Sequence, residues 1–246
     1  MSGAPARAQR PAFYALGGGR LGDLVTLLHP PYTAWHLSYF ALGAAAAPHV
    51  YADRVAWGLA AFALAVGVAA HALDERHDRP LRTALGDRTL AVLATVTLLG
   101  ALAIGVAGAI VVTPWLAPLV LLGGAFVPAY NLELVSGRVH GDTWFALGWG
   151  AFPAFTGYFV NAERIALPGL LVAAGAFALS VAQRRLSAPA RELRRRTVEV
   201  SGERVCSDGS REPLTLACML APLDGALAAL SIALVLGAAG LLAARL

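Results

Sequence analysis

Long stretches of the chain contain no Asp, Glu or Arg, and short polar segments separate them. The uncharged stretches cover residues 24–52, 55–73, 89–132, 143–162, 165–183 and 225–244. A helix needs about 20 apolar residues to cross the hydrocarbon core of a bilayer. The third stretch is long enough for two such helices, and Thr113-Pro114 near its middle favours a turn. The pattern therefore predicts a bundle of about seven transmembrane helices.

The composition is that of a membrane protein. Hydrophobic residues make up 58% of the chain and charged residues only 14%, whereas soluble domains carry about 25% charged residues. Such a chain has too few polar residues to cover a globular surface. We therefore expect an all-α integral membrane protein in which residues 1–246 form a single transmembrane domain, surrounded by membrane lipids and binding no nucleic acid.

The distribution of arginine predicts the orientation. Lysine is absent, which excludes a retinal Schiff base and other lysine-dependent covalent chemistry. With the N-terminus inside, sixteen of the nineteen arginines fall in cytoplasmic segments, where positive charge is retained. We expect a multi-pass protein of the cell membrane with its active face in the cytoplasm. Its cytoplasmic parts include an N-terminal segment over 1–22 and an arginine-rich loop over 184–221.

Two local motifs refine the predicted elements. The triplet His29-Pro30-Pro31 suits the first turn of a helix but not its interior, so the first helix is expected to begin near Pro31. Within the arginine-rich loop, Ser201-Gly202 and Asp208-Gly209 favour turns. Residues 198–213 are therefore expected to form a small hairpin.

Unusual polar residues gather at the predicted cytoplasmic ends of the helices. Charged groups inside the hydrocarbon cost roughly 2.5 to 3.5 kcal/mol each and usually face a polar cavity. Each residue alone has a plain structural explanation, such as a solvated helix end or a hydrogen bond to a neighbouring carbonyl. As a group at one membrane face they indicate a functional site. The residues are His36, His71, Asp74, Glu75, Asp78, Tyr130, Asn131, Glu133, His140 and Asp142.

The end of the second helix shows the most specific spacing. His71, Asp74 and Asp78 are three, four and seven positions apart, so they share one stripe of the helix, and Glu75 adjoins that stripe. Carboxylates aligned in this way repel one another. We therefore expect a compensating positive charge next to this stripe.

Two compensating charges are available next to this stripe. One is a hard divalent ion such as Mg²⁺, which takes oxygen ligands and commonly bridges to phosphate. The other is the pair Arg79 and Arg82, because guanidinium groups bind phosphate oxygens through paired hydrogen bonds. Both would suit a diphosphate substrate. The same histidines and carboxylates could equally bind Zn²⁺ or iron.

At these residues the sequence resembles the UbiA superfamily of intramembrane prenyltransferases. That family carries an N-D-x-x-D-x-x-x-D motif at the cytoplasmic end of its second helix, followed by an arginine- and proline-rich segment. Here Asp74 and Asp78 stand at the second and third aspartate positions, while Ala70 and His71 replace the Asn and the first Asp. The likeness covers residues 22–185 and includes Arg79-Pro80-Leu81-Arg82, Leu27-Leu28-His29-Pro30-Pro31 and Ala129-Tyr130-Asn131.

The chain resembles a divergent member of that family. The second aspartate-rich motif of the family follows its sixth helix, where this chain has Arg184, Arg185 and further arginines but no D-x-x-x-D. These arginines would hold the loop in the cytoplasm and touch anionic lipid. Alternatively, Arg184 or Arg185 reaches the cavity and binds diphosphate in place of the missing second metal cluster. The family usually has nine helices, against the seven expected here.

The resemblance implies a membrane enzyme that ionises an isoprenoid diphosphate, either for prenyl transfer to a lipophilic acceptor or for terpene cyclisation. In this interpretation Asp74 and Asp78 hold Mg²⁺, and His71 and Glu75 complete the catalytic group. The residues expected to bind substrate are His36, Arg79, Arg82, Tyr130, Asn131, Glu133, His140, Arg184 and Arg185.

Two other classes of function fit the same residues. The first is a metal-dependent membrane oxidoreductase or hydrolase with a site built from His36, His71, Glu75, Glu133 and His140. The second is a lipid-binding or transport protein without catalytic activity. Metal analysis of the purified protein distinguishes these alternatives. Bound iron or zinc favours the first, Mg²⁺ gained only with a prenyl diphosphate favours the isoprenoid enzyme, and no metal under both conditions favours the second.

Overall fold

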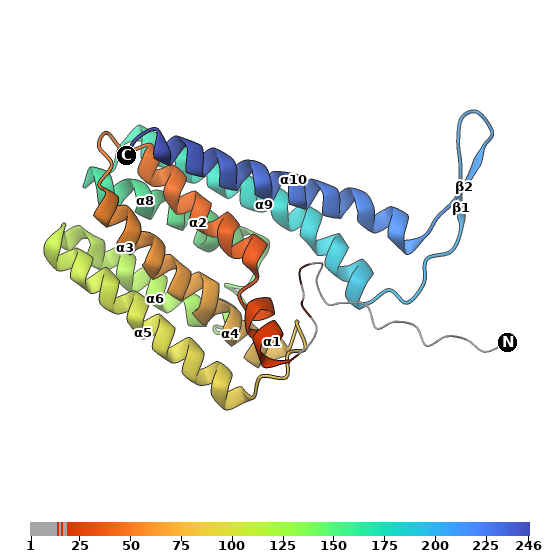
Figure 1. The fold of residues 1–246 in the computed structure, drawn as a ribbon, viewed down its shortest axis with the longest axis horizontal. Helices are drawn as coiled ribbons and strands as arrows, with labels where there is room; N and C mark the ends of the chain where they lie inside the picture. The colour runs from red at the N-terminus through yellow and green to blue at the C-terminus, as the bar shows by residue number, and fades with distance from the viewer. Residues whose placement is uncertain (1–13, 15, 17–18) are drawn as a thin grey trace.

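The structure, a computed structural model, describes residues 14, 16 and 19–246 and is almost wholly helical in that part of the chain (Figure 1). Most of the expected N-terminal segment 1–22 lies outside the described residues. The helices are α1 (Arg20–Leu27), α2 (Pro30–Ala45), α3 (Ala52–Phe62), η1 (Ala63–Ala70), α4 (His71–Asp78), α5 (Asp87–Val111), η2 (Pro114–Leu116), α6 (Ala117–Asn131), α7 (Asp142–Phe145), η3 (Ala146–Ala151), α8 (Phe152–Ala162), α9 (Leu167–Arg195) and α10 (Leu216–Ala243). The strands are β1 (Glu203–Val205) and β2 (Arg211–Pro213).

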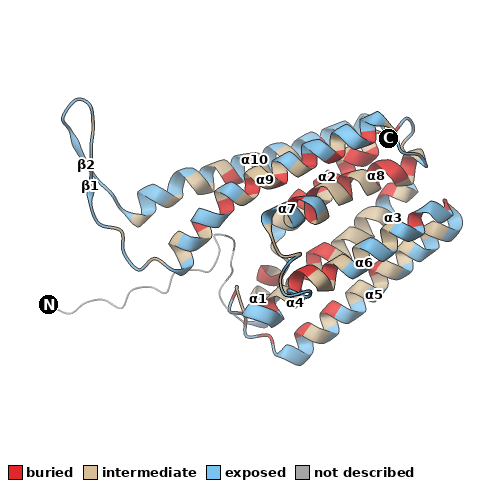
Figure 2. Ribbon diagram, turned by 180° about the vertical axis from the view of Figure 1, so that it is seen from behind, coloured by how far each residue is buried: buried red, intermediate tan, exposed pale blue. Residues whose placement is uncertain are grey.

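Four helical stretches are long and apolar enough to cross a membrane, judged by length and composition. They are the continuous stretch from α3 to α4, α5, α9 and α10. The outer faces of α5 and α10 are largely exposed (Figure 2), and Ile110, Ile232 and Leu236 on these faces are 79%, 59% and 66% exposed. Apolar surface of this kind marks contact with lipid or with another protein. The chain is therefore an all-α protein of membrane character.

Helical segments lie at each of the seven predicted positions. The expected turn at Thr113-Pro114 is confirmed, because α5 ends at Val111 and η2 begins at Pro114. The first helix is predicted to start near Pro31, and α2 begins at Pro30. The helices α2 and α6 have 16 and 15 residues, fewer than the roughly 20 that a straight crossing of the hydrocarbon needs.

The arginine-rich segment after the sixth stretch differs in part from expectation. Helix α9 continues to Arg195, so residues 184–195, expected within a loop, are helical. Arginines end the apolar pattern there, but arginine itself favours helix. The expected hairpin is confirmed, because β1 pairs antiparallel with β2. In Figure 1, α9 and α10 run side by side and extend beyond the other helices toward this hairpin.

Close packing between α2 and α8 fixes the helix that carries His36. A side-chain carbon placed on Gly43 would lie 1.9 Å from the backbone oxygen of Ala154, and one on Gly157 would lie 2.0 Å from the backbone oxygen of Phe40. Only glycine permits this approach of the two backbones. This contact places the inner face of α2 against the continuous helical stretch formed by η3 and α8.

Two of the helical stretches contain a π-helical segment near their middle. One is η1, which continues directly into α4, and the other is η3, which links α7 to α8. The wider turn of a π-helix changes which backbone carbonyls are free to bond, and such turns are frequent at functional sites. Both segments border the same cavity, through Val66 and Ala70 on η1 and Trp149 on η3.

Candidate functional site

A polar cavity of about 520 Å³ lies among α2, α4, α6, η3 and α9. Most of the residues proposed from the sequence line this cavity, although they come from segments far apart in the chain. The lining residues among them are His36, His71, Asp74, Asp78, Arg79, Arg82, Tyr130, Asn131, Glu133, His140 and Arg184. The structure thus brings together eleven of the thirteen residues proposed to act in catalysis or substrate binding. Glu75 and Arg185 do not line the cavity.

Glu75 is fully buried and organises the loop that follows α4. Its carboxylate accepts hydrogen bonds from the backbone N–H of Leu81 at 2.8 Å, from the backbone N–H of Thr83 at 2.8 Å and from the Thr83 hydroxyl at 2.9 Å. The loop held in this way contains Arg79 and Arg82, whose φ angles are 52° and 54°. Glu75 therefore does not face the cavity. It holds in place the loop that carries Arg79 and Arg82, which do line the cavity.

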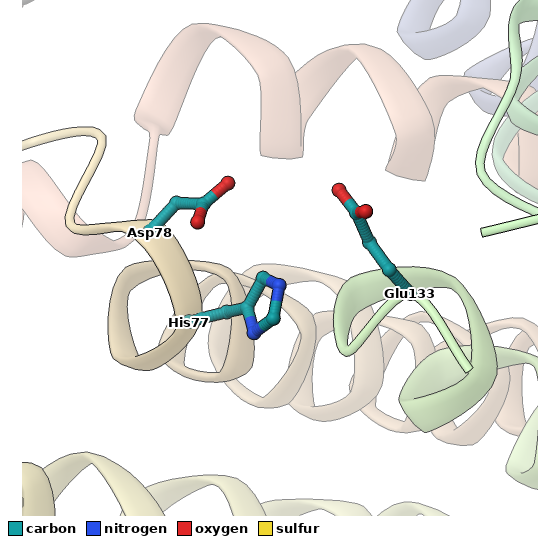
Figure 3. A group of neighbouring side chains, drawn as sticks. All are labelled: His77, Asp78 and Glu133. Carbon is teal, nitrogen blue, oxygen red and sulfur yellow. The ribbon is translucent and has the colours of Figure 1, made fainter. Parts of the chain in front are cut away.

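Three carboxylates form an acidic wall on one side of the cavity. Asp74 and Asp78 lie one helical turn apart on α4, and Glu133 follows α6. Figure 3 shows the carboxylates of Asp78 and Glu133 directed toward the same space, with the His77 ring between them. One ligand atom each from the exposed residues His77, Asp78 and Glu133 lies within 4.8 Å of the others, and Asp74 is not part of this group. Oxygen-rich groups at this spacing suit a hard divalent cation.

Six arginines from α9 and the loop after α4 form a basic wall, which consists of Arg79, Arg82, Arg184, Arg191, Arg194 and Arg195. Three of them pair with aspartates that do not line the cavity: Arg79 with Asp87, Arg184 with Asp142 at 2.7 Å, and Arg194 with Asp224. Within the described residues, Arg82, Arg191 and Arg195 make no ion pair. Free guanidinium groups facing a pocket favour an anionic ligand with several oxygens.

Several lining residues were not identified from the sequence. They are Tyr14, His29, Tyr32, Gln183, Ser187, Arg191, Arg194 and Arg195. Helical periodicity would have found part of this set, because Arg184, Ser187, Arg191 and Arg194 are spaced three, four and three positions apart on α9. That signal is visible only if the helix is extended past the end of its apolar stretch.

His29 is the most constrained of these residues. Its backbone is left-handed, with φ 43° and ψ 57° at the start of α2. Its Nδ1 is 2.6 Å from the Tyr14 hydroxyl, its ring stacks on His71 with the centroids 4.1 Å apart, and its buried Nε2 has no hydrogen-bond partner. Burial and the nearby His71 lower the pKa of His29 well below its ordinary value.

The backbone around the cavity is strained at several points. Among the described residues other than glycine, seven have φ in the left-handed region, and four of these line the cavity: His29, Arg79, Arg82 and Glu133. Each such conformation costs about 1 to 3 kcal/mol and is typically found at ligand-binding sites. Gln183, which is 3% exposed, also lines the cavity with its buried Oε1 unpaired. The cavity wall therefore combines left-handed backbone with an unpaired polar atom.

A second, apolar cavity of about 580 Å³ adjoins the polar one. Leu98, Leu102, Val120 and Phe152 are among its lining residues, and most of the set comes from α3, η1, α5, α6, η3 and α8. Val66 and Trp149 line both cavities. Both residues lie on the π-helical segments η1 and η3. The polar and apolar spaces are therefore adjacent compartments with a common boundary.

The alternative metal site of histidines and carboxylates is not assembled in this arrangement. Glu75 is occupied by the loop at 81–83. In the part of the chain that the structure describes, His77, Asp78 and Glu133 are the one set of three side chains whose candidate ligand atoms lie within 4.8 Å of one another. His36, His71 and His140 each direct Nδ1 at a backbone oxygen, of Trp149, Gly67 and Tyr130 respectively.

Comparison of the chain with protein-family models, curated proteins and solved structures gave no match.

Proposed function

We propose that the protein is a UbiA-like membrane enzyme that ionises an isoprenoid diphosphate. The observation that carries this proposal is the common boundary of the two cavities at Val66 and Trp149. A charged compartment with free arginines beside an apolar compartment of similar size matches a ligand with a polyanionic head and a hydrocarbon tail.

The head of the substrate would lie between the acidic and basic walls. Arg82, Arg191 and Arg195, which lack ion pairs in the described structure, would bind diphosphate oxygens. Asp74 and Asp78 would hold Mg²⁺, and a carboxylate oxygen of Glu133 lies within 4.8 Å of one of Asp78. When bound, Mg²⁺ would supply positive charge to the diphosphate leaving group. The basic wall takes the place of the second aspartate motif that the sequence lacks.

The tail of the substrate would lie beyond Val66 and Trp149. Phe126 and Phe152 contribute aromatic surface to this compartment, and apolar walls exclude water from the reactive carbon. Exclusion of water strengthens the interactions of the arginines with developing negative charge. The product would be either a prenylated lipophilic acceptor or a cyclised hydrocarbon.

The proposed topology follows from the same assignment. We propose seven transmembrane segments in the cell membrane, the N-terminus in the cytoplasm and the polar cavity open to the cytoplasmic side. The support is the arginine distribution, because the basic wall belongs to the arginine-rich end of α9. A diphosphate would then reach the cavity from the cytoplasm or the inner leaflet, and its tail would stay in an apolar environment.

Binding of a stable substrate analogue tests this function. Farnesyl thiolodiphosphate with Mg²⁺, at about 100 times its Kd, should stabilise the purified protein by about 2.7 kcal/mol, or roughly 5 to 10 °C in Tm. Pyrophosphate and farnesol each fill one compartment and should give smaller shifts at the same concentration. Equal stabilisation by farnesol would favour a lipid-binding protein. The absence of any shift with the thiolodiphosphate would contradict the proposal.

A further inference from the structure

The boundary between the two cavities is surrounded by aromatic rings. Trp149 packs against Phe126, with centroids 5.2 Å apart, and against Tyr130 at 5.5 Å. Phe145 lies 6.3 Å from Tyr130 and 5.8 Å from His36. The cluster spans the boundary, since Phe126 lines the apolar cavity and Tyr130 and Phe145 line the polar one.

This cluster lies where the reactive carbon of the substrate would be. If the diphosphate occupies the polar compartment and the chain the apolar one, the allylic carbons lie near Val66 and Trp149. Aromatic faces attract a cation placed over them. The carboxylates that line the polar cavity lie instead on α4 and after α6, at the polar end. The boundary is therefore suited to an allylic carbocation.

His36 is the basic group at this boundary. Its side chain is 5% exposed and its Nδ1 lies 2.7 Å from the backbone oxygen of Trp149. A carbonyl oxygen only accepts hydrogen bonds, so Nδ1 must carry the proton and donate it. Nε2 of the neutral ring consequently carries a lone pair. No described residue donates a hydrogen bond to that Nε2, and the side chain lines the polar cavity.

The other histidines of the cavity are placed differently. His71 also directs Nδ1 at a backbone oxygen, that of Gly67, but its ring stacks on His29 at the start of α2. His140 lies beside Glu133, with 3.7 Å between Nε2 and the nearer carboxylate oxygen, at the acidic wall. His36 alone among the described histidines bonds to a residue that lines both cavities.

We propose that His36 is the general base that ends the reaction, so that the product is an alkene. This inference rests on the proposed function and selects the hydrocarbon outcome over transfer to an acceptor. The allylic C–O bond breaks and its electron pair leaves with diphosphate. A C–H bond next to the resulting cation then breaks, its pair forms a C=C bond, and the proton binds Nε2 of His36. The imidazolium loses that proton to the aqueous end of the polar cavity.

Product analysis of a His36→Gln variant tests the inference. Glutamine can still donate an amide N–H to the Trp149 carbonyl but has no basic nitrogen. With farnesyl diphosphate and Mg²⁺, the products of the variant are compared with those of the wild type per pyrophosphate released. The ratio of hydrocarbon to farnesol should fall at least tenfold, because water then captures the cation; general base catalysis is worth about 10² to 10⁴-fold. His49→Gln, outside both cavities, is the matched control and should keep the wild-type ratio.

The possible failures are distinguishable. A wild-type protein that releases no pyrophosphate would overturn the proposed function and this inference with it. An active His36→Gln variant with the wild-type product ratio would overturn the inference alone. ¹⁵N NMR of the wild-type histidines gives a test that needs no variant to fold: Nδ1 of His36 should carry the proton and Nε2 the lone pair, and the reverse assignment would also overturn the inference.

Discussion

Asp74→Asn should reduce turnover of an isoprenoid diphosphate by about 10² to 10³-fold, the scale expected when one fixed electrostatic contributor is lost. Asparagine keeps the size of the side chain but removes the charge that a hard cation needs. No described residue forms an ion pair or a hydrogen bond with Asp74, so the neutral amide loses no structural contact. The melting temperature should therefore stay at the wild-type value or rise. Steady-state kinetics and thermal unfolding of the purified protein measure the two quantities.

The control for this variant needs an aspartate outside the cavity. Asp208→Asn is suitable, because Asp208 is exposed in the β1–β2 turn and accepts a hydrogen bond from the Ser210 backbone N–H. Asp87 is unsuitable, since it pairs with Arg79 at the cavity edge. Turnover in Asp208→Asn should remain within twofold of wild type. Wild-type turnover in Asp74→Asn would leave the acidic wall without a catalytic role.

Arg191→Gln should weaken binding of the diphosphate head by about 10 to 150-fold, which corresponds to loss of a charged hydrogen bond worth about 1.5 to 3 kcal/mol. Arg191 makes no ion pair within the described structure and donates to the Ser187 hydroxyl at 3.2 Å, so its charge is available to a ligand. The affinity for pyrophosphate with Mg²⁺, measured by calorimetry, should fall by the same factor as that for farnesyl thiolodiphosphate.

Arg185→Gln is the matched control on the same helix. Arg185 is exposed and lies off the stripe of α9 that lines the cavity. Removal of its charge should change affinity by less than threefold, because solvent and salt screen a distant exposed charge. Equal losses in the two variants would indicate a general electrostatic effect of the arginine-rich segment. In that case the arginines of the basic wall would have no specific role in binding the diphosphate.

The helical architecture could be predicted because it depends on local patterns. The uncharged stretches, Thr113-Pro114 and the His29-Pro30-Pro31 triplet locate helix ends through backbone chemistry that is visible in the sequence. The hairpin follows from its turn residues in the same way. The end of α9 was misplaced, because the change from apolar to basic residues marks a change of surroundings and not of backbone conformation.

The candidate site could be predicted only in outline. The helical spacing of His71, Asp74 and Asp78 places them on one stripe, and the structure puts that stripe at the cavity. Spacing did not determine which way Glu75 points, because its direction depends on the loop that returns over α4. It also did not separate Arg184 from Arg185, since adjacent helical residues point about 100° apart and the facing helix decides which one enters.

Contacts between distant segments could not be predicted from the sequence. Val66 and Trp149 belong to one buried cluster at the cavity boundary, and each lies on a π-helical segment. No pattern in the sequence predicts these two segments. The left-handed backbone of His29 and its stacking on His71 likewise depend on tertiary contacts at the start of α2. The proposed function depends on these contacts, because they form the boundary between the polar and the apolar cavity.

Photo-crosslinking with a farnesyl diphosphate analogue that carries a diazirine at the far end of its tail tests the central claim most directly. If the head lies in the polar cavity and the tail in the apolar one, mass spectrometry should find the label on α5 and α6, at residues such as Leu102 and Val120. Excess pyrophosphate with Mg²⁺ should reduce that labelling. A label on residues 183–195, or labelling that excess unlabelled farnesyl diphosphate does not reduce, would contradict the account.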